Sequence, residues 1–186
     1  MKKKLLLIFV MVILTLSFAA CGNKSDGPLT GKWAYIHDDV TTVLELKANG
    51  KALYEGNEYT YTTDDKFITM TDKNGIAQTF RYLVESDGIL FYKTTTYVNK
   101  ENSNPDSLVG VWTGKEVENW TFEFTENGEF KEDGYFPGYF TEDKSAGTIK
   151  LVYNDHFEDT TVYYEMKGNE LTIQYPWKMV KTVKGK

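Results

Sequence analysis

Leu29-Thr-Gly31-Lys-Trp33 recurs as Leu108-Val-Gly110-Val-Trp112, and these two stretches decide how the rest of the chain is interpreted. Each copy continues with an alternating segment, an Asn-Gly pair and a closing hairpin, in the same order. The alternating segments are 42–46 and 120–124, the Asn-Gly pairs are 49–50 and 127–128, and the closing hairpins are 80–92 and 162–175. A pattern of this length that occurs twice indicates two structural units rather than a solenoid.

Short strands dominate the expected secondary structure. Apolar and polar residues alternate with period two, and β-branched and aromatic side chains are frequent. Asn49-Gly50, Asn74-Gly75, Asn127-Gly128 and Asp87-Gly88 favour tight hairpins, because a type I′ turn needs a positive φ angle at both central positions. No stretch after residue 21 keeps a 3.6-residue apolar period. The sequence therefore predicts an all-β protein, built as two tandem small antiparallel β-barrels or sandwiches with pseudo-twofold kinship and a modest interface.

A polar segment separates the two copies. Residues 99–106 are polar and include one proline, as expected of an interdomain linker. The predicted domains are therefore residues 29–98 and 107–186. Each copy is about 70 residues long, a size at which one hydrophobic core is only marginally stable. Large aromatic side chains, and packing of one copy against the other, are expected to offset that deficit.

The N-terminus has the three parts of a secretory signal. Lys2, Lys3 and Lys4 precede an apolar run over residues 5–16, and small residues come before Cys21. The run is shorter than the twenty or so residues that a transmembrane helix needs. We expect residues 1–20 to be a cleaved signal peptide. An uncleaved N-terminal anchor is the alternative, and it gives nearly the same topology.

Cys21 is the single cysteine, and it stands where a bacterial lipobox places the residue that becomes lipidated. The N-terminus therefore resembles that of a bacterial lipoprotein precursor. The resemblance implies acylation of Cys21 and a lipid anchor on the extracytoplasmic face of the cell membrane, where two or more chains make attachment lasting. Residues 21–28 would form a flexible tether. The preponderance of lysine over arginine suggests a Gram-positive source.

Charge limits the partners that the mature chain can have. Without residues 1–20 it carries 18 basic and 27 acidic residues, a net charge of −9. Such a surface repels nucleic acid, so nucleic acid is not an expected partner. Lys178, Lys181, Lys184 and Lys186 depart from this trend near the C-terminus. They either protect an edge strand from further pairing or contact lipid headgroups or an anionic wall polymer.

The two Gly-x-Trp motifs carry a second resemblance. Gly31/Trp33 and Gly110/Trp112 match the motif that opens the first strand of lipocalins, and the likeness covers residues 29–98 and 107–183. It implies small lipocalin-like β domains of the kind common in bacterial lipoproteins, mostly without an assigned activity. In such a domain the tryptophan plugs one end of a barrel. Each copy is shorter than a full eight-stranded lipocalin, so a capacious ligand cavity is not expected.

The segment over residues 134–140 is the least ordinary part of the chain. Tyr135, Phe136, Tyr139 and Phe140 lie beside one proline and two glycines. If exposed, these rings are candidate binding residues for a sugar, a peptide or a protein partner. The alternative is that the four side chains alternate into strands that close the second barrel.

Metal and cofactor sites are not expected. The clusters at residues 37–39 and 155–159 combine histidine with acidic residues, but neither has the spacing of a structural zinc site. Asp72-Lys-Asn74-Gly75 lacks the later ligands of a calcium loop and is better explained as a hairpin turn.

Catalysis is not expected either. The chain has no Gly-x-Ser-x-Gly elbow, and nothing in the sequence positions a pair of carboxylates as in a glycosidase. The expected function is a membrane-anchored, non-catalytic binding or interaction module with a protein, peptide or glycan partner. A structural or enzyme-regulating lipoprotein of the cell envelope is the alternative, and a hydrolase is less favoured.

Overall fold

The computed structural model describes residues 27–37, 41–99, 106–154 and 157–182. These ranges form fourteen strands and no helix, which confirms the prediction of an all-β protein. The first seven strands are β1 Gly31–Tyr35, β2 Leu44–Leu46, β3 Lys51–Tyr54, β4 Asn57–Thr63, β5 Phe67–Thr71, β6 Ala77–Val84 and β7 Ile89–Val98. The other seven are β8 Gly110–Gly114, β9 Thr121–Phe124, β10 Glu129–Glu132, β11 Phe136–Asp143, β12 Thr148–Tyr153, β13 Thr160–Lys167 and β14 Glu170–Lys181. A helix long and apolar enough to cross a membrane is absent from these described ranges.

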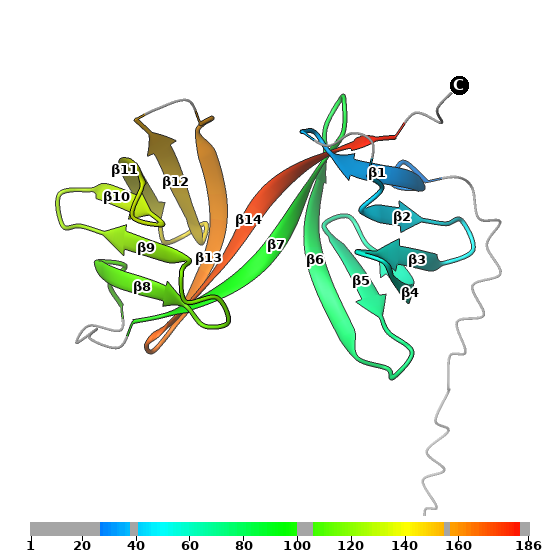
Figure 1. Ribbon diagram of the computed structural model, residues 1–186, viewed down its shortest axis with the longest axis horizontal. Helices are drawn as coiled ribbons and strands as arrows, with labels where there is room; N and C mark the ends of the chain where they lie inside the picture. The colour runs from blue at the N-terminus through cyan, green and yellow to red at the C-terminus, as the bar shows by residue number, and fades with distance from the viewer. Residues whose placement is uncertain (1–26, 38–40, 100–105, 155–156, 183–186) are drawn as a thin grey trace, which may run out of the picture.

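The strands form one antiparallel ring that is bridged across its middle. Each strand pairs with a neighbour in sequence, and β14 pairs with β1 to close the ring. β14 also pairs with β7 over ten residues, from Ile89↔Met179 to Val98↔Glu170. This ladder divides the ring into a first half-ring (β1–β7 with β14) and a second half-ring (β7–β14), each closed by eight strands. Figure 1 shows β7 and β14 running diagonally from one group of strands to the other.

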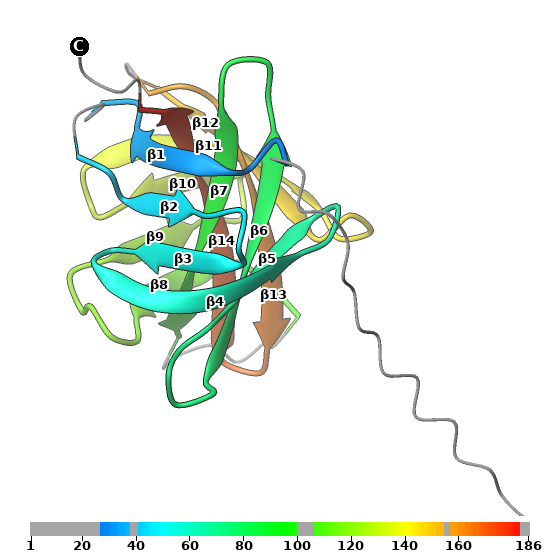
Figure 2. The same ribbon diagram turned by 90° about the vertical axis from the view of Figure 1, so that its right-hand side faces the viewer.

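β7 and β14 serve both half-rings because they pair with each other along one edge, and each pairs with two different strands at the two ends of its other edge. β6 pairs with the start of β7 at Ile89, whereas β8 pairs with its end at Val98. Likewise, β13 pairs with the start of β14, and β1 pairs with its end at Met179. The last strand of the chain therefore completes the half-ring that the first strand opens. Figure 2, which looks onto β1–β4, shows this end of the molecule.

The two half-rings are related by an approximate twofold axis. Ile89 of β7 pairs with Met179 of β14, and Leu171 of β14 pairs with Tyr97 of β7. A twofold rotation that exchanges β7 with β14 therefore places Ile89 on Leu171 and Tyr97 on Met179. The same rotation exchanges Lys93 with Tyr175, which are paired with each other and so lie at the centre of the ladder. We call this central stretch of the ladder the waist.

On one face of the ladder, Arg81 of the first half-ring contacts Tyr163 of the second across the waist. Arg81 of β6 lies with its guanidinium carbon 3.8 Å from the centroid of the Tyr163 ring on β13. Its Nε donates a hydrogen bond to Gln174 Oε1 at 3.3 Å. A guanidinium can stack on an aromatic face and donate in its own plane at once, which a lysine cannot do. Arg81 is the single arginine of the chain, and it joins the two half-rings.

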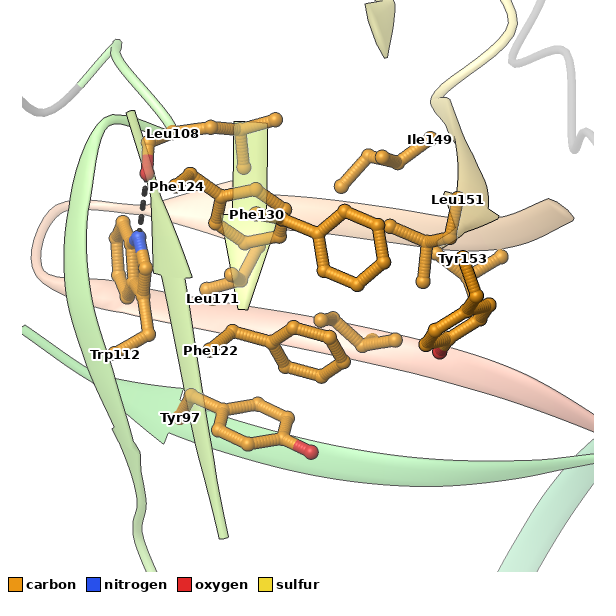
Figure 3. Close-up of a cluster of buried hydrophobic side chains, with 12 residues drawn as sticks. Tyr97, Leu108, Trp112, Phe122, Phe124, Phe130, Ile149, Leu151, Tyr153 and Leu171 are labelled. Carbon is orange, nitrogen blue, oxygen red and sulfur yellow. Dashed lines mark hydrogen bonds between the residues drawn. The ribbon is translucent and has the colours of Figure 1, made fainter. Parts of the chain in front are cut away.

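Each half-ring encloses its own hydrophobic core. The alternation seen in the sequence is the cause, because successive side chains of a strand point to opposite faces. The first core comprises Leu29, Trp33, Leu44, Leu46, Ala52, Tyr54, Ile68, Met70, Ile89, Phe91 and Met179. The second comprises Tyr97, Leu108, Trp112, Phe122, Phe124, Phe130, Ile149, Leu151, Tyr153, Val162, Leu171 and Ile173, and Figure 3 shows it in close-up.

The three Asn-Gly pairs do join paired strands, which confirms the predicted hairpins, but the turns are not type I′ and that part of the prediction is wrong. Gly50, Gly75 and Gly128 have positive φ angles, but the asparagine before each does not. At the first of these turns Gly50 N donates to Lys47 O, and Lys47 N donates to Lys51 O. A longer loop with one left-handed glycine forms, and it needs only that glycine. Two successive positive φ angles occur instead at 55–56 and 133–134.

Candidate functional site

The two Gly-x-Trp motifs lie at the ends of the half-rings away from the waist. Trp33 pairs with Lys181 at the far end of β14, and its Nε1 donates a hydrogen bond to Leu29 O at 2.8 Å. Trp112 makes the corresponding bond to Leu108 O at 2.6 Å (Figure 3). Both indoles are buried and their N–H groups are satisfied, so they close these ends. A binding site is therefore to be sought at the opposite ends, at the waist.

Gly31 and Gly110 precede these tryptophans and have φ angles of +140° and +134°. Only glycine adopts this backbone conformation readily. Gly110 is also held close to the Asn99 side chain, whose Nδ2 would lie 2.5 Å from an added Cβ. The glycine of each motif therefore sets the backbone path that brings the indole into the core.

The four aromatic residues of the 134–140 segment lie in three different environments. Tyr135 is 83% exposed and Phe136 is 38% exposed. Tyr139 lies on the outer face of β11, whereas Phe140 packs edge-on against Phe124 at 4.9 Å and belongs to the periphery of the second core. The segment thus divides between surface and core rather than following either expectation as a whole.

Tyr139 lines a groove on the outer face of β9, β10 and β11. The groove has a volume of about 320 Å³, and Glu123, Glu129 and Lys131 also border it. A similar groove of about 290 Å³ lies on the outer face of β3 and β4, where Lys47 and Lys51 lie along it. Tyr139 does not contact the other exposed rings of the segment, so it is separate from the waist.

The waist carries a continuous chain of aromatic contacts that sequence analysis did not find. We call it the waist strip and define it as Tyr35, Trp177, Tyr175, Tyr153, Phe157 and Phe136. Tyr35 and Trp177 come from the first half-ring and its closing strand. The other members belong to the second half-ring, and the shared strand β14 links the two groups.

Successive members of the strip are in contact. The ring centroids are 5.4 Å apart for Tyr35 and Trp177, and 6.3 Å apart for Trp177 and Tyr175. Tyr175 then shares a hydrogen bond with Tyr153 at 3.1 Å between their hydroxyl oxygens. Tyr153 and Phe157 are 5.5 Å apart, and Phe157 and Phe136 are 4.9 Å apart. Trp177 is 45% exposed and Phe157 is 54% exposed, so the strip presents apolar surface to solvent.

The second half-ring places a carboxyl group beneath this strip. Glu132, the last residue of β10, accepts a hydrogen bond from the Tyr153 hydroxyl. Burial raises the pKa of the Glu132 carboxyl, and the Tyr153 hydrogen bond only partly opposes that change. Burial and the nearby Glu132 charge also raise the pKa of Tyr153. We call Glu132, Tyr97, Tyr153 and Tyr175 the second mouth.

The first half-ring has an ammonium group at the corresponding place. Lys93 Nζ lies 2.6 Å from Glu55 Oε1, and it also lies 5.6 Å from the Tyr35 ring centroid and 6.0 Å from that of Trp177. Burial alone would lower the pKa of Lys93, but the hydrogen bond to Glu55 and the nearby Tyr35 and Tyr54 hydroxyls together outweigh it and raise the pKa. We call Lys93, Glu55, Tyr35 and Trp177 the first mouth. Among the described side chains, the Tyr35 hydroxyl is the one buried polar atom without a hydrogen-bond partner.

The waist combines aromatic faces with a few polar side chains. Within the described ranges, no three His, Cys, Asp or Glu side chains converge as they would around a metal ion. Asp38, Asp39, Asp155 and His156 of the two acidic-histidine clusters lie outside the described residues. Aromatic faces with a few polar groups between them are typical of ligand sites.

Comparison of the chain with models of protein families, with curated proteins and with solved structures returns no match. The function must therefore be argued from the site itself.

Of the predicted site residues, only Phe136 belongs to the waist strip. Sequence analysis missed Trp177, Tyr175 and Tyr153 because each looks like an ordinary strand aromatic. One feature of the sequence could have indicated them. Tyr175 and Trp177 lie on the same face of β14 as the buried Leu171 and Ile173, but this face becomes exposed to solvent further along the strand. The length of β14, twelve residues, indicates that the strand extends beyond the second half-ring.

Proposed function

We propose that the protein is a non-catalytic binding module of the cell envelope, tethered to the membrane through acylated Cys21, and that the waist strip is its binding surface. The exposed rings of the strip carry this proposal: Trp177, Phe157 and Phe136, which are linked through the less exposed Tyr175 and Tyr153. Contiguous exposed aromatic surface is unusual on a soluble protein and is typical of interaction sites. Rigid rings also bind at a small cost in side-chain entropy.

We further infer that each half-ring is a lipocalin-like β domain. Two observations support this: each half-ring closes through eight strands, and each buries the tryptophan of a Gly-x-Trp motif at one end. The missing length of each copy is then supplied by the other copy, through β7 and β14. Both interiors are filled by core side chains, so the proposed surface lies at the waist.

The described chain begins at the end of the first half-ring that lies away from the waist. It begins at Gly27, and Leu29 carries the carbonyl that Trp33 binds at the far end of the first half-ring. The end of β14 lies there too, because Thr182 N donates to Lys32 O at 2.9 Å. A membrane anchor that precedes residue 27 would therefore join the protein at this end, away from the waist strip, and leave the strip accessible.

Replacing Cys21 by serine is expected to move the protein from the membrane fraction to the medium, or to stall its processing. Serine cannot form the thioether that would carry the acyl chains. Cell fractionation followed by immunoblotting measures this. Membrane partition that is unchanged in Cys21→Ser would contradict lipid anchoring.

Removing three exposed rings of the strip is expected to abolish ligand capture with little effect on stability. The variant combines Phe136→Ser, Phe157→Ser and Trp177→Ser, all at positions with substantial solvent exposure. Immobilised protein starting at residue 22, which contains every described residue, is incubated with envelope extract. The retained proteins, glycans and small molecules are then identified by mass spectrometry.

Trp120→Ser is the matched control for that experiment. Trp120 is 46% exposed, nearly the same as Trp177, but it makes no ring contact with the strip among the described residues. The proposal predicts that Trp120→Ser captures the same components as the native chain. Equal capture by the triple variant would show that the strip is not the binding surface.

A further inference from the structure

Corresponding positions give the two mouths different side chains. Tyr54 ends β3 as Glu132 ends β10, and each is followed by two residues with positive φ angles. Lys93 and Tyr175 correspond because they face each other at the twofold centre of the β7–β14 ladder. The two mouths therefore share a backbone arrangement but carry different charged side chains: Lys93 in the first and Glu132 in the second.

The first mouth contains a cation supplied by the chain itself. The Lys93 ammonium forms an ion pair with Glu55 at 2.6 Å and lies near the Tyr35 and Trp177 rings. An ammonium group between aromatic rings and a carboxylate gains both cation–π attraction and Coulomb energy. The carboxylate of the first mouth is therefore already paired with a cation from the chain itself.

The second mouth has the rings and the carboxylate but lacks this cation. Glu132 is half-buried and forms no ion pair among the described residues; its one hydrogen bond comes from Tyr153. Tyr175 occupies the position that Lys93 has in the first mouth. Tyr97 is buried in the second core, and its burial, together with the Glu132 and Asp133 charges, raises the pKa of its hydroxyl.

We propose that the second mouth binds the ammonium group of an organic cation, which takes the place that Lys93 has in the first mouth. This inference rests on the proposed function and names its ligand class. A carboxylate removed from water without a cation is costly, and a bound ammonium group offsets that cost. The net charge of the mature chain also attracts cations.

The chemistry favours an organic cation over a metal ion. A hard metal ion needs several oxygen ligands from different directions, whereas the second mouth offers one carboxylate and tyrosine rings. Alkylammonium groups, in contrast, bind against aromatic faces. Phe157 packs against Tyr153, Phe136 packs against Phe157, and both are exposed, so they can cover the apolar part of the same ligand.

The test measures binding of choline to the chain that starts at residue 22, by calorimetry and by the fluorescence of the native tryptophans. The neutral probe is 3,3-dimethylbutan-1-ol, which has the shape of choline without its charge. The proposal predicts binding of choline, and at least about tenfold weaker binding of the neutral alcohol. Equal binding of the two probes would overturn it.

Three variants make the test specific. Glu132→Gln keeps the shape of the side chain and is expected to weaken choline binding by about tenfold or more. Tyr175→Lys rebuilds the first mouth within the second, so its ammonium should pair with Glu132 and abolish choline binding. Tyr139→Phe, on the outer face of β11 and outside the second mouth, is the control and should retain choline binding.

Choline binding that is unchanged in Glu132→Gln would refute the inference, even if Tyr175→Lys fails to fold. The proposed function is tested separately by capture from envelope extract. Capture that depends on the strip, without any binding of choline, would overturn the ammonium assignment and leave the proposed function in place.

Discussion

A chain that ends at residue 106 is expected to remain unfolded, although it contains the whole of the first sequence repeat. Residues 179–181 of β14 pair with β1 and close the first half-ring, and Met179 belongs to its core. Without them, β1 and β7 become open edges, and β7 loses the ten pairs of its ladder with β14. A sheet with two exposed edges and an incomplete core is prone to aggregate rather than to fold.

The complementary piece, residues 107–186, fails for the same reason. It lacks β7, which supplies Tyr97 to the second core and pairs with both β8 and β14. Circular dichroism during urea titration should show no cooperative transition for either fragment alone, and a cooperative transition when the two are mixed. A native chain cleaved between residues 99 and 106 after folding is the control, and it should remain associated.

Cooperative unfolding of the 22–106 fragment by itself would contradict this expectation. It would mean that the first repeat is a separate domain that needs nothing from the end of the chain. In that case the β7–β14 ladder would be an interface between two independent domains, and neither half-ring would need it in order to fold.

Trp112→Ala is expected to lower the free energy of unfolding by about 3–5 kcal/mol. The indole is fully buried at the closed end of the second half-ring and contributes to a core rich in aromatic side chains. Truncation removes its apolar surface and also leaves the Leu108 carbonyl without the hydrogen bond from Nε1. Urea denaturation monitored by circular dichroism measures the change.

Two further variants separate the causes. Trp112→Phe keeps a ring but removes the hydrogen bond, so a loss of about 1–3 kcal/mol is expected from the unpaired carbonyl and the smaller side chain. Trp120→Ala, at a 46% exposed position, should change stability by no more than about 0.5 kcal/mol. Similar losses for Trp112→Ala and Trp120→Ala would show that the Gly-x-Trp indole does not hold the core together.

The sequence repeat predicted the strands well because each strand carries its own local signal. Gly31 and Gly110, the alternating segments after them and the glycine turns all recur at corresponding places in the structure. Period-two alternation reports which face of a strand is buried, and that property does not depend on distant partners.

The sharing of β7 and β14 could not be predicted in the same way. Alternation shows that residues 89–98 and 170–181 are strands, but it does not show which strand each one pairs with. Pairing between residues about 80 positions apart is set by closure of the whole ring. The turn type was predicted wrongly because a longer loop needs a positive φ angle only at the glycine. An Asn-Gly pair therefore does not determine the turn type.

The candidate site was found only in part because it is assembled across the ladder. Phe136 was expected as a binding residue from its local sequence, and it does lie in the waist strip. Trp177 and Tyr153 come from strands that appear ordinary by themselves. Glu132 gained significance only when its burial and its correspondence with the first mouth could be seen.

Oxidative cross-linking of β7 to β14 tests most directly that these strands run side by side through both half-rings. Thr96 and Thr172 are paired in register, and their hydroxyl oxygens lie 3.4 Å apart. Cys21 is the single cysteine of the chain, so protein that starts at residue 22 has no competing thiol. The double variant Thr96→Cys/Thr172→Cys should form an intramolecular disulfide on mild oxidation, since paired strand residues meet its geometric requirements.

Mass spectrometry after alkylation counts the free thiols. The account predicts none in the oxidised double variant, and two in the control Thr69→Cys/Thr172→Cys, whose positions lie on β5 and β14 and are not paired. Two alkylated cysteines in Thr96→Cys/Thr172→Cys would contradict the shared ladder.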